Sequence, residues 1–252
     1  WDTLLAAAEK AGKKVGMTFA SGWYNASFFY GAGFTTALND DGSTAMDWNG
    51  TSADGVTGVQ VVQAMLGIAG NSAFLPIADG DVSNQIASGE LCAVVSGTWD
   101  AAAAQTAFGE GYAATKLPEF TLSNGETVQM GSMANFKIMG VNSETKNPLD
   151  AMALAEWLTN KDNQKLRFEK RSFAPTNVEL ANDTETMNSN IAIGALALQA
   201  QYATVQTSIS QCQNFWTPAE AFGQEIIAGT CTKDNLQEKL DAYVNSVLAT
   251  LG

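Results

Sequence analysis

The chain has 252 residues, of which 46% are apolar, enough for one or two globular domains with a sizeable core. Its net charge of −13 and its sparse lysines and arginines disfavour nucleic acid as a partner, and the acidity suits solubility in an exposed compartment. The sequence contains no histidine, which excludes Ser-His-Asp and Cys-His catalysis and histidine metal sites.

Strand and helix signals alternate in the first part of the chain. The pattern predicts helices at 2–11, 26–38, 56–68 and 81–87, and strands at 15–19, 46–48 and 91–95. Trp23 and Tyr24 fall in the loop between the first strand and the second helix. This alternation predicts an α/β fold with a largely parallel sheet.

The second part of the chain is richer in helix signals. We expect helices at 100–108, 148–159, 161–170, 190–203, 218–228 and 233–251, and strands at 112–116 and 136–141. Asp100 is the expected cap of the first of these helices, and Asn124-Gly125 predicts a hairpin turn.

The three cysteines form no metal-binding pair. Cys92 lies in the apolar run 91–95, so we expect a buried, unreactive thiol. Cys212 and Cys231 flank a predicted helix of about 18 Å, which favours two free thiols over a disulfide. Asp40-Asp41 and Asp79-Gly80-Asp81 fit no EF-hand pattern, and turn and cap roles explain them. We therefore expect no metal and no other cofactor.

No apolar run reaches the roughly 20 residues that a membrane span requires. The chain also shows no signal peptide and no lipid-attachment cysteine. We expect any export signal and membrane anchor to lie upstream of Trp1.

Residues 86–99, IASGELCAVVSGTW, combine a helix end, a stop at Gly89, an apolar strand, a tight turn and Trp99. This places a large aromatic side chain at the carboxyl end of a strand, where open α/β sheets bind ligands. The stretch resembles the "phe-x-x-gly-glu-x-ala-met … gly-x-trp" pattern of bacterial extracellular solute-binding proteins of carbohydrate ABC transporters, the maltose-binding type. Ile86 stands in the aromatic position, and Cys92-Ala93-Val94 departs from the pattern.

Other segments resemble the same family in the same order. They are the helix and turn at 151–164, the chain break at 172–176, Asn214-Phe215-Trp216 before Thr217-Pro218, and the final helix. Trp1-Asp2-Thr3 looks like the start of a mid-protein helix, so the resemblance implies the C-terminal part of such a protein. It implies a type II periplasmic-binding-protein fold. Residues 1–130 and 190–252 would form the C-terminal lobe, and residues 131–189 would belong to an incomplete N-terminal lobe.

Aromatic rings stack on the C–H faces of sugars, while polar groups meet the hydroxyls. The resemblance therefore assigns stacking roles to Trp99 and Trp216, and to Tyr24 or its neighbour Trp23. The family's glutamate near this tyrosine is missing here, since Ser21 and Gly22 fill that region.

The sequence also offers weaker candidates for the site. Ser132, with Gly131, falls where the chain would cross the cleft, and the glycine serves either ligand approach or a hinge. Asn214 either meets a hydroxyl or shapes a turn. Trp48 and Trp157 are expected to be packing residues. We predict that the stacking aromatics converge on one concave surface.

The resemblance implies a non-catalytic receptor that binds an oligosaccharide and delivers it to the permease subunits of an ABC importer. Maltose or maltotriose is the first candidate ligand. The location would be extracellular or periplasmic, as a lipoprotein whose anchor is not in this chain. The alternatives are a carboxylate-based glycoside hydrolase that uses Glu90 and Glu119, and a surface adhesin or scaffold without a concave aromatic site.

Overall fold

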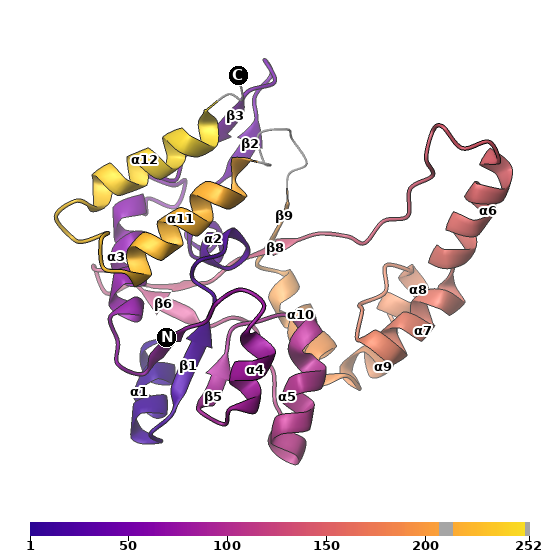
Figure 1. Ribbon diagram of the computed structural model, residues 1–252, viewed down its shortest axis with the longest axis horizontal. Coiled ribbons are helices and arrows are strands. Elements are labelled where there is room, and N and C mark those ends of the chain that lie inside the picture. Colours follow the sequence, from indigo (N-terminus) through magenta and orange to yellow (C-terminus); the bar gives the residue numbers. More distant parts are fainter. Residues whose placement is uncertain (207–213, 250–252) are drawn as a thin grey trace. The chain divides into compact units, whose positions relative to one another are not determined.

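The alternating signals of the first part of the chain build a three-stranded parallel sheet in the computed structural model, which describes residues 1–206 and 214–249 (Figure 1). Strand β1 (Lys14–Met17) lies between β4 (Phe74–Pro76) and β5 (Leu91–Val94), with Val15 opposite Phe74 and Gly16 opposite Val94. The predicted parallel α/β arrangement is confirmed.

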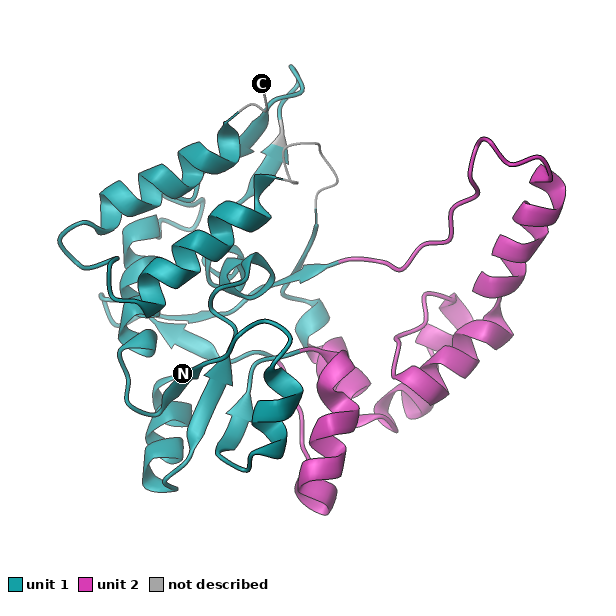
Figure 2. Cartoon of the chain, in the orientation of Figure 1, with its two compact units in different colours: residues 1–96, 117–134, 199–252 teal, residues 97–116, 135–198 magenta. Residues whose placement is uncertain are grey.

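The chain forms two compact units, drawn in different colours in Figure 2. Unit 1 comprises Trp1–Ser96, Leu117–Ala134 and Gln199–Gly252, and unit 2 comprises Gly97–Lys116 and Asn135–Leu198. The predicted lobe boundaries differ from this division, which groups residues 97–116 with residues 135–198. The assignment of the segments to two lobes of a larger protein remains a prediction.

The helices of unit 1 agree with the predicted ones except at their ends. They are α1 (Asp2–Lys10), α2 (Gly22–Gly31), α3 (Gly58–Ala69), α4 (Val82–Ala87), α11 (Trp216–Ile227) and α12 (Leu236–Leu248). Thr57 and Gln60 form a capping box at the start of α3, in which each backbone N–H donates to the other side chain.

Helix α2 is the largest departure in unit 1, because the prediction of a helix at 26–38 is wrong at both ends. Ser21 takes an extended conformation, and its carbonyl accepts hydrogen bonds from the backbone N–H groups of Tyr24 and Asn25. The helix therefore begins at Gly22. After its end at Gly31 the chain extends into β2 (Thr36–Leu38), which pairs antiparallel with β3 (Thr44–Met46).

An aromatic cluster fills the core between α2, α11 and α12. Trp48 is fully buried and stacks on Phe29 at 4.3 Å between ring centroids. Phe215 and Tyr243 meet the same indole edge-on. The expected packing role of Trp48 is confirmed.

The remaining strands form two small pairs. β6 (Glu119–Thr121) and β7 (Thr127–Gln129) make the hairpin predicted at Asn124-Gly125, where Gly125 has a φ of +89°. β8 (Ser132–Ala134) runs parallel to β9 (Ala203–Val205). The strand predicted at 112–116 is wrong, because that segment has no regular structure and the chain pairs only from Glu119.

The burial predicted for Cys92 is wrong. Its thiol is exposed and free, because β5 is an edge strand of the sheet and alternate residues turn away from the core, with Leu91 buried and Cys92 outside. Cys231 is buried and free. Cys212 lies outside the described residues.

The regular elements of unit 2 are helices, joined by long irregular segments such as residues 135–147. Its elements are η1 (Thr98–Asp100), α5 (Ala101–Phe108), η2 (Gly109–Gly111), α6 (Pro148–Thr159), α7 (Lys161–Arg171), α8 (Val178–Ala181), α9 (Thr184–Asn188) and most of α10 (Ile191–Ala200). The helix pair predicted at 148–159 and 161–170 is confirmed.

Two predictions for unit 2 are wrong, and they share a cause. Residues 136–141 are not a strand, and Ile138 is 84% exposed; Trp157, expected in a core, is 58% exposed. An apolar pattern becomes a strand or a core face only when another element covers it, and α6 buries none of its residues.

In the part of the chain that the structure describes, no helix is long and apolar enough to cross a membrane.

Candidate functional site

Trp23 and Tyr24 lie in the first turn of α2, not in the loop where they were predicted. The early start of the helix at Gly22 draws both residues into it. Tyr24 is 8% exposed and belongs to the core, whereas Trp23 is half-buried at the core's edge. Of the two, Trp23 offers more of its ring to a ligand.

Trp216 is the first residue of α11, where Phe215 occupies the N-cap position. Its indole is half-buried and meets the ring of Phe215 edge-on, at 5.3 Å between centroids. Because Phe215 is buried against Trp48, the partly exposed Trp216 rests on a rigid aromatic base.

The amino ends of α2 and α11 lie against each other. A Cβ atom at Gly22 would come within 2.6 Å of Phe215 Cε1 and 2.9 Å of Ala219 Cβ. The absence of a side chain at Gly22 thus lets the helices approach, and it brings the start of the helix that carries Trp23 and Tyr24 close to the start of the helix that carries Trp216.

Asn25 fastens this contact. Its Nδ2 donates to the carbonyl of Ala219 in α11 at 2.8 Å and to the carbonyl of Phe19 at 3.2 Å. The side chain is buried, so both bonds are shielded from water. One amide therefore links three segments: the residues that follow β1, helix α2 and helix α11. The sequence signal that could have identified it is a single amide within an otherwise apolar helical run.

Asn214 precedes α11 and is half-buried. Its Nδ2 donates to the carbonyl of Ala249 at 3.0 Å, after the end of α12. The amide nitrogen therefore ties two chain segments together, and the role of Asn214 toward a hydroxyl remains a prediction for its carbonyl oxygen.

Gly131 and Ser132 lie beside the second half of α2. The Gly131 N–H donates to the Ser27 carbonyl at 2.8 Å, and a Cβ at Gly131 would meet the backbone nitrogen of Gly31 at 2.9 Å. The bare Cα at 131 thus serves close packing against α2. The half-buried Ser132 lies in β8, with its Oγ 3.5 Å from Gln199 Nε2.

Trp99 belongs to unit 2, so its convergence with Trp216 on one surface remains a prediction. It lies in η1 and is 57% exposed. Its ring folds back over Gly97, where a Cβ would lie 2.3 Å from the indole atoms Cζ3 and Cη2. Asp100 takes the predicted N-cap position of α5, without a side-chain cap bond.

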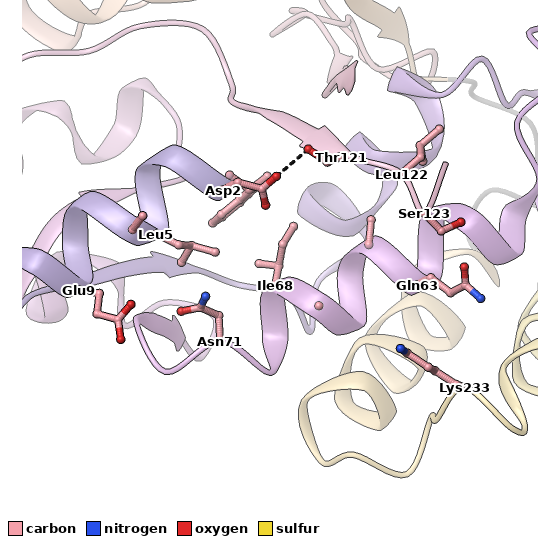
Figure 3. A pocket seen from close by; sticks show the side chains of 14 residues that line it. Asp2, Leu5, Glu9, Gln63, Ile68, Asn71, Thr121, Leu122, Ser123 and Lys233 are labelled. Atoms are coloured by element: carbon pink, nitrogen blue, oxygen red, sulfur yellow. Dashed lines mark hydrogen bonds between the residues drawn. The ribbon is translucent and has the colours of Figure 1, made fainter. Parts of the chain in front are cut away.

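A separate cavity of about 610 Å³ opens in unit 1 between α1, α3 and the β6–β7 turn (Figure 3). Leu5, Ile68 and the carboxylates of Asp2 and Glu9 help to line it, and Asp2 accepts a hydrogen bond from Thr121 Oγ1 at 2.6 Å. The volume is in the range of ligand pockets. None of the six predicted ligand residues lines it, nor do Glu90 and Glu119, so it is distinct from the predicted site.

The candidate site residues offer aromatic rings, an amide and a hydroxyl for contact with a ligand. Glu90 and Glu119, the pair considered for hydrolysis, are both exposed. Glu90 directly precedes β5, and Glu119 is the first residue of β6, in another sheet. Within residues 1–206 and 214–249, no three His, Cys, Asp or Glu side chains gather in a way that could hold a metal ion.

Known structures share this fold. A maltodextrin-binding protein from L. casei BL23 superimposes with a TM-score of 0.78 at 23% identity, over 99% of this chain and 65% of that chain. The maltose-maltodextrin binding protein of Alicyclobacillus acidocaldarius gives 0.71 at 19% identity, again over 99% and 65%. The fold is therefore that of the type II periplasmic sugar-binding proteins.

A protein-family model described as "Bacterial extracellular solute-binding protein" matches residues 1–195. The chain belongs to this family of bacterial extracellular solute-binding proteins, as its motifs predicted. A galactooligosaccharide-binding protein of Bacillus subtilis (strain 168) is 34% identical over 141 residues, which are 56% of this chain and 32% of that protein. The matched segment spans about a third of that relative and the chain under two thirds of the structural neighbours.

Proposed function

We propose that this chain carries part of the sugar site of a non-catalytic carbohydrate receptor that serves an ABC importer. Its family is that of extracellular solute-binding proteins, and its relative from Bacillus subtilis is named for a galactooligosaccharide. The proposed place of action is outside the cytoplasm, at the cell surface or in the periplasm, and the proposed partners are the permease subunits of the importer.

The observation that carries the proposal is the contact between the amino ends of α2 and α11. Two half-buried indoles, Trp23 and Trp216, lie at the starts of these helices, each packed against the core on one side. A half-buried ring keeps a fixed orientation and still presents a surface to a sugar. Tyr24 is proposed to contribute its hydroxyl edge, and Ser132 and Asn214 are the proposed partners for sugar hydroxyls.

Trp99 is the proposed platform from unit 2. Its exposed ring lies close over Gly97 and leaves a large surface for stacking. The ligand is proposed to be an oligosaccharide, because the relative from Bacillus subtilis is named for a galactooligosaccharide. Maltotriose and a galactooligosaccharide are the two ligands to compare.

Calorimetric titration of the purified chain with each sugar tests the proposal. We expect Trp216→Ala and Trp99→Ala each to weaken binding by at least about tenfold, since each stacking ring contributes about 1.4 kcal/mol or more. Trp157→Ala is the matched control, because Trp157 is as exposed as Trp99 and lies outside the proposed site. Equal losses in all three variants, or none in the first two, would contradict the assignment.

Incubation with labelled oligosaccharide separates a receptor from a hydrolase. We expect the sugar to be recovered intact after prolonged incubation, and release of shorter sugars would contradict the proposal.

A further inference from the structure

The contact between α2 and α11 is built largely of small residues. Gly22 in α2 faces Ala219 in α11, and a Cβ atom at Gly223, one turn later, would lie 2.2 Å from the Phe19 carbonyl oxygen. Side chains this small let the backbones approach closely, but they form shallow ridges, and interlocking ridges are what fix the place of one helix along another. The shape of these residues therefore holds the register of the two helices only weakly.

Asn25 adds a directional bond across this contact. Its side chain is 1% exposed, and its Nδ2 donates to the Ala219 carbonyl at 2.8 Å and to the Phe19 carbonyl at 3.2 Å. Both partners are acceptors, so they require the nitrogen end of the amide. Because Phe19 precedes α2 and Ala219 lies within α11, the two bonds form together at one register of α11 on α2.

The other end of the same amide shows that stability alone does not explain it. Asn25 Oδ1 is buried and accepts no hydrogen bond among the described residues. A buried acceptor without a partner destabilises the folded state, and an apolar side chain of similar size would avoid that loss. A buried asparagine that lowers stability can still specify the register of packed helices, as it does in coiled coils.

The bond lies close to two proposed stacking rings of unit 1. Asn25 follows Trp23 by two residues in α2, and Ala219 follows Trp216 by three in α11, so each bonded position lies within one helical turn of its ring. A shift of α11 by one residue would move Trp216 by about 1.5 Å along the helix axis and turn it by about 100°. The register of the two helices thus sets the spacing of the two indoles.

We propose that Asn25 is a positioning residue that sets the register of α11 on α2 and thereby the spacing of the Trp23 and Trp216 rings. It acts through the two helices and not through contact with a ligand. The value of that spacing for sugar binding rests on the proposed function, whereas the spacing itself can be measured without a sugar.

Fluorine NMR of the chain labelled with 5-fluorotryptophan tests the spacing in the absence of sugar. The resonances of the six tryptophans are assigned by replacing each in turn with phenylalanine. We expect Asn25→Leu, which keeps the approximate size and loses both bonds, to shift or broaden the resonances of Trp23 and Trp216. Those of Trp99 and Trp157 in unit 2 should not move. Asn25→Ala repeats the test without overpacking if Asn25→Leu does not fold.

The matched control is Gln199→Leu. Gln199 is another buried amide of unit 1, 6% exposed, which accepts from the Leu117 N–H at 2.9 Å and donates to the Met130 carbonyl at 3.1 Å. These partners lie outside α2 and α11, so we expect the variant to unfold at a lower temperature while the Trp23 and Trp216 resonances stay in place.

Unchanged Trp23 and Trp216 resonances in both Asn25 variants would overturn the proposal. Equal shifts in Gln199→Leu would overturn it as well, because general loosening of unit 1 would then explain them.

Calorimetric titration with maltotriose and with a galactooligosaccharide separates this proposal from the proposed function. We expect Asn25→Leu to weaken binding by about tenfold, the loss expected for one stacking ring. Shifted resonances with unweakened binding would support the role of Asn25 in spacing the rings and would contradict the stacking roles of Trp23 and Trp216.

Discussion

The indole of Trp99 owes its orientation to the residue two positions before it. With no side chain at Gly97, the Trp99 ring can lie against the backbone of its own turn. Any side chain at position 97 would therefore compete with the ring for this space.

Gly97→Ala should displace the Trp99 ring, because the new Cβ would lie 2.3 Å from two of its atoms. We expect weaker binding of oligosaccharide, with little change in thermal stability, since the ring is mostly exposed. Titration and thermal unfolding measure the two effects. Gly111→Ala is the control, because a Cβ there meets nothing within 4 Å. A shared loss of binding would refute the steric explanation.

Tyr243 carries a hydroxyl that has no hydrogen-bond partner among the described residues, although its ring stacks on Phe222 at 4.9 Å. Burial, and to a lesser degree repulsion from Tyr30, raises the pKa of this phenol well above its usual range. The folded protein thus keeps the proton at a pH where the unfolded chain has released it. Stability falls as the pH rises above about 10, by about 1.4 kcal/mol per unit from this group.

Tyr243→Phe removes both the unsatisfied hydroxyl and the titration of the phenol. We expect the free energy of unfolding in urea to rise by about 1 kcal/mol at pH 8, because an unsatisfied buried hydroxyl is lost. We also expect the decline above pH 10 to become shallower than in the unchanged protein. A lower stability of the variant at pH 8 would mean that the hydroxyl has a partner after all.

At the scale of elements, glycine decides how closely α11 approaches the rest of unit 1. A Cβ at Gly223 would lie 2.2 Å from the Phe19 carbonyl oxygen, a backbone atom that cannot rotate away. Gly223→Ala should therefore destabilise the protein by about 3 kcal/mol or more, as an overpacked core does.

Gly67→Ala is the matched opposite. Gly67 lies inside α3 with nothing within 4 Å of a new Cβ, so alanine should stabilise the helix by about 0.5–1 kcal/mol. Chemical unfolding measures both variants. Similar effects of the same sign would show that the close approach of α11 does not control its packing.

The elements show where sequence reasoning reaches its limit. The parallel sheet, the hairpin at Gly125 and the helix pair of unit 2 followed from local patterns. The start of α2 did not, although serine is a common N-cap residue, because Ser21 begins the helix through its backbone carbonyl and makes no side-chain cap bond. Residues 136–141 read as a strand, yet a strand exists only when a partner pairs with it.

At the scale of the whole molecule, the predicted site residues divide between the units. Trp23, Tyr24, Trp216, Asn214 and Ser132 lie in unit 1 and Trp99 in unit 2. The sequence indicated the aromatics through motif and position. The single amide in the apolar run of α2 marks Asn25, but the sequence could not indicate its partner Ala219, because a contact so far along the chain follows from tertiary packing.

Exposed apolar side chains are plentiful in unit 2, and Leu149 in α6 is an example. Leu149→Glu should change the free energy of unfolding by less than about 0.5 kcal/mol, because an exposed side chain gives up few packing contacts. Leu240→Glu in α12 is the contrast, since Leu240 is fully buried and a charge there should prevent folding. Strong destabilisation by Leu149→Glu would mean that another surface covers α6.

The repeated passage of the chain between the units has a consequence for how the protein is made. Trp48 is synthesised well before the rings of Phe215 and Tyr243, which pack against it. A ribosome delivers the segments of unit 1 with those of unit 2 interposed, so the core of unit 1 cannot close until α11 and α12 have emerged. Contacts of such long range make folding slow, and the core of unit 1 stays open until both of these helices have been synthesised.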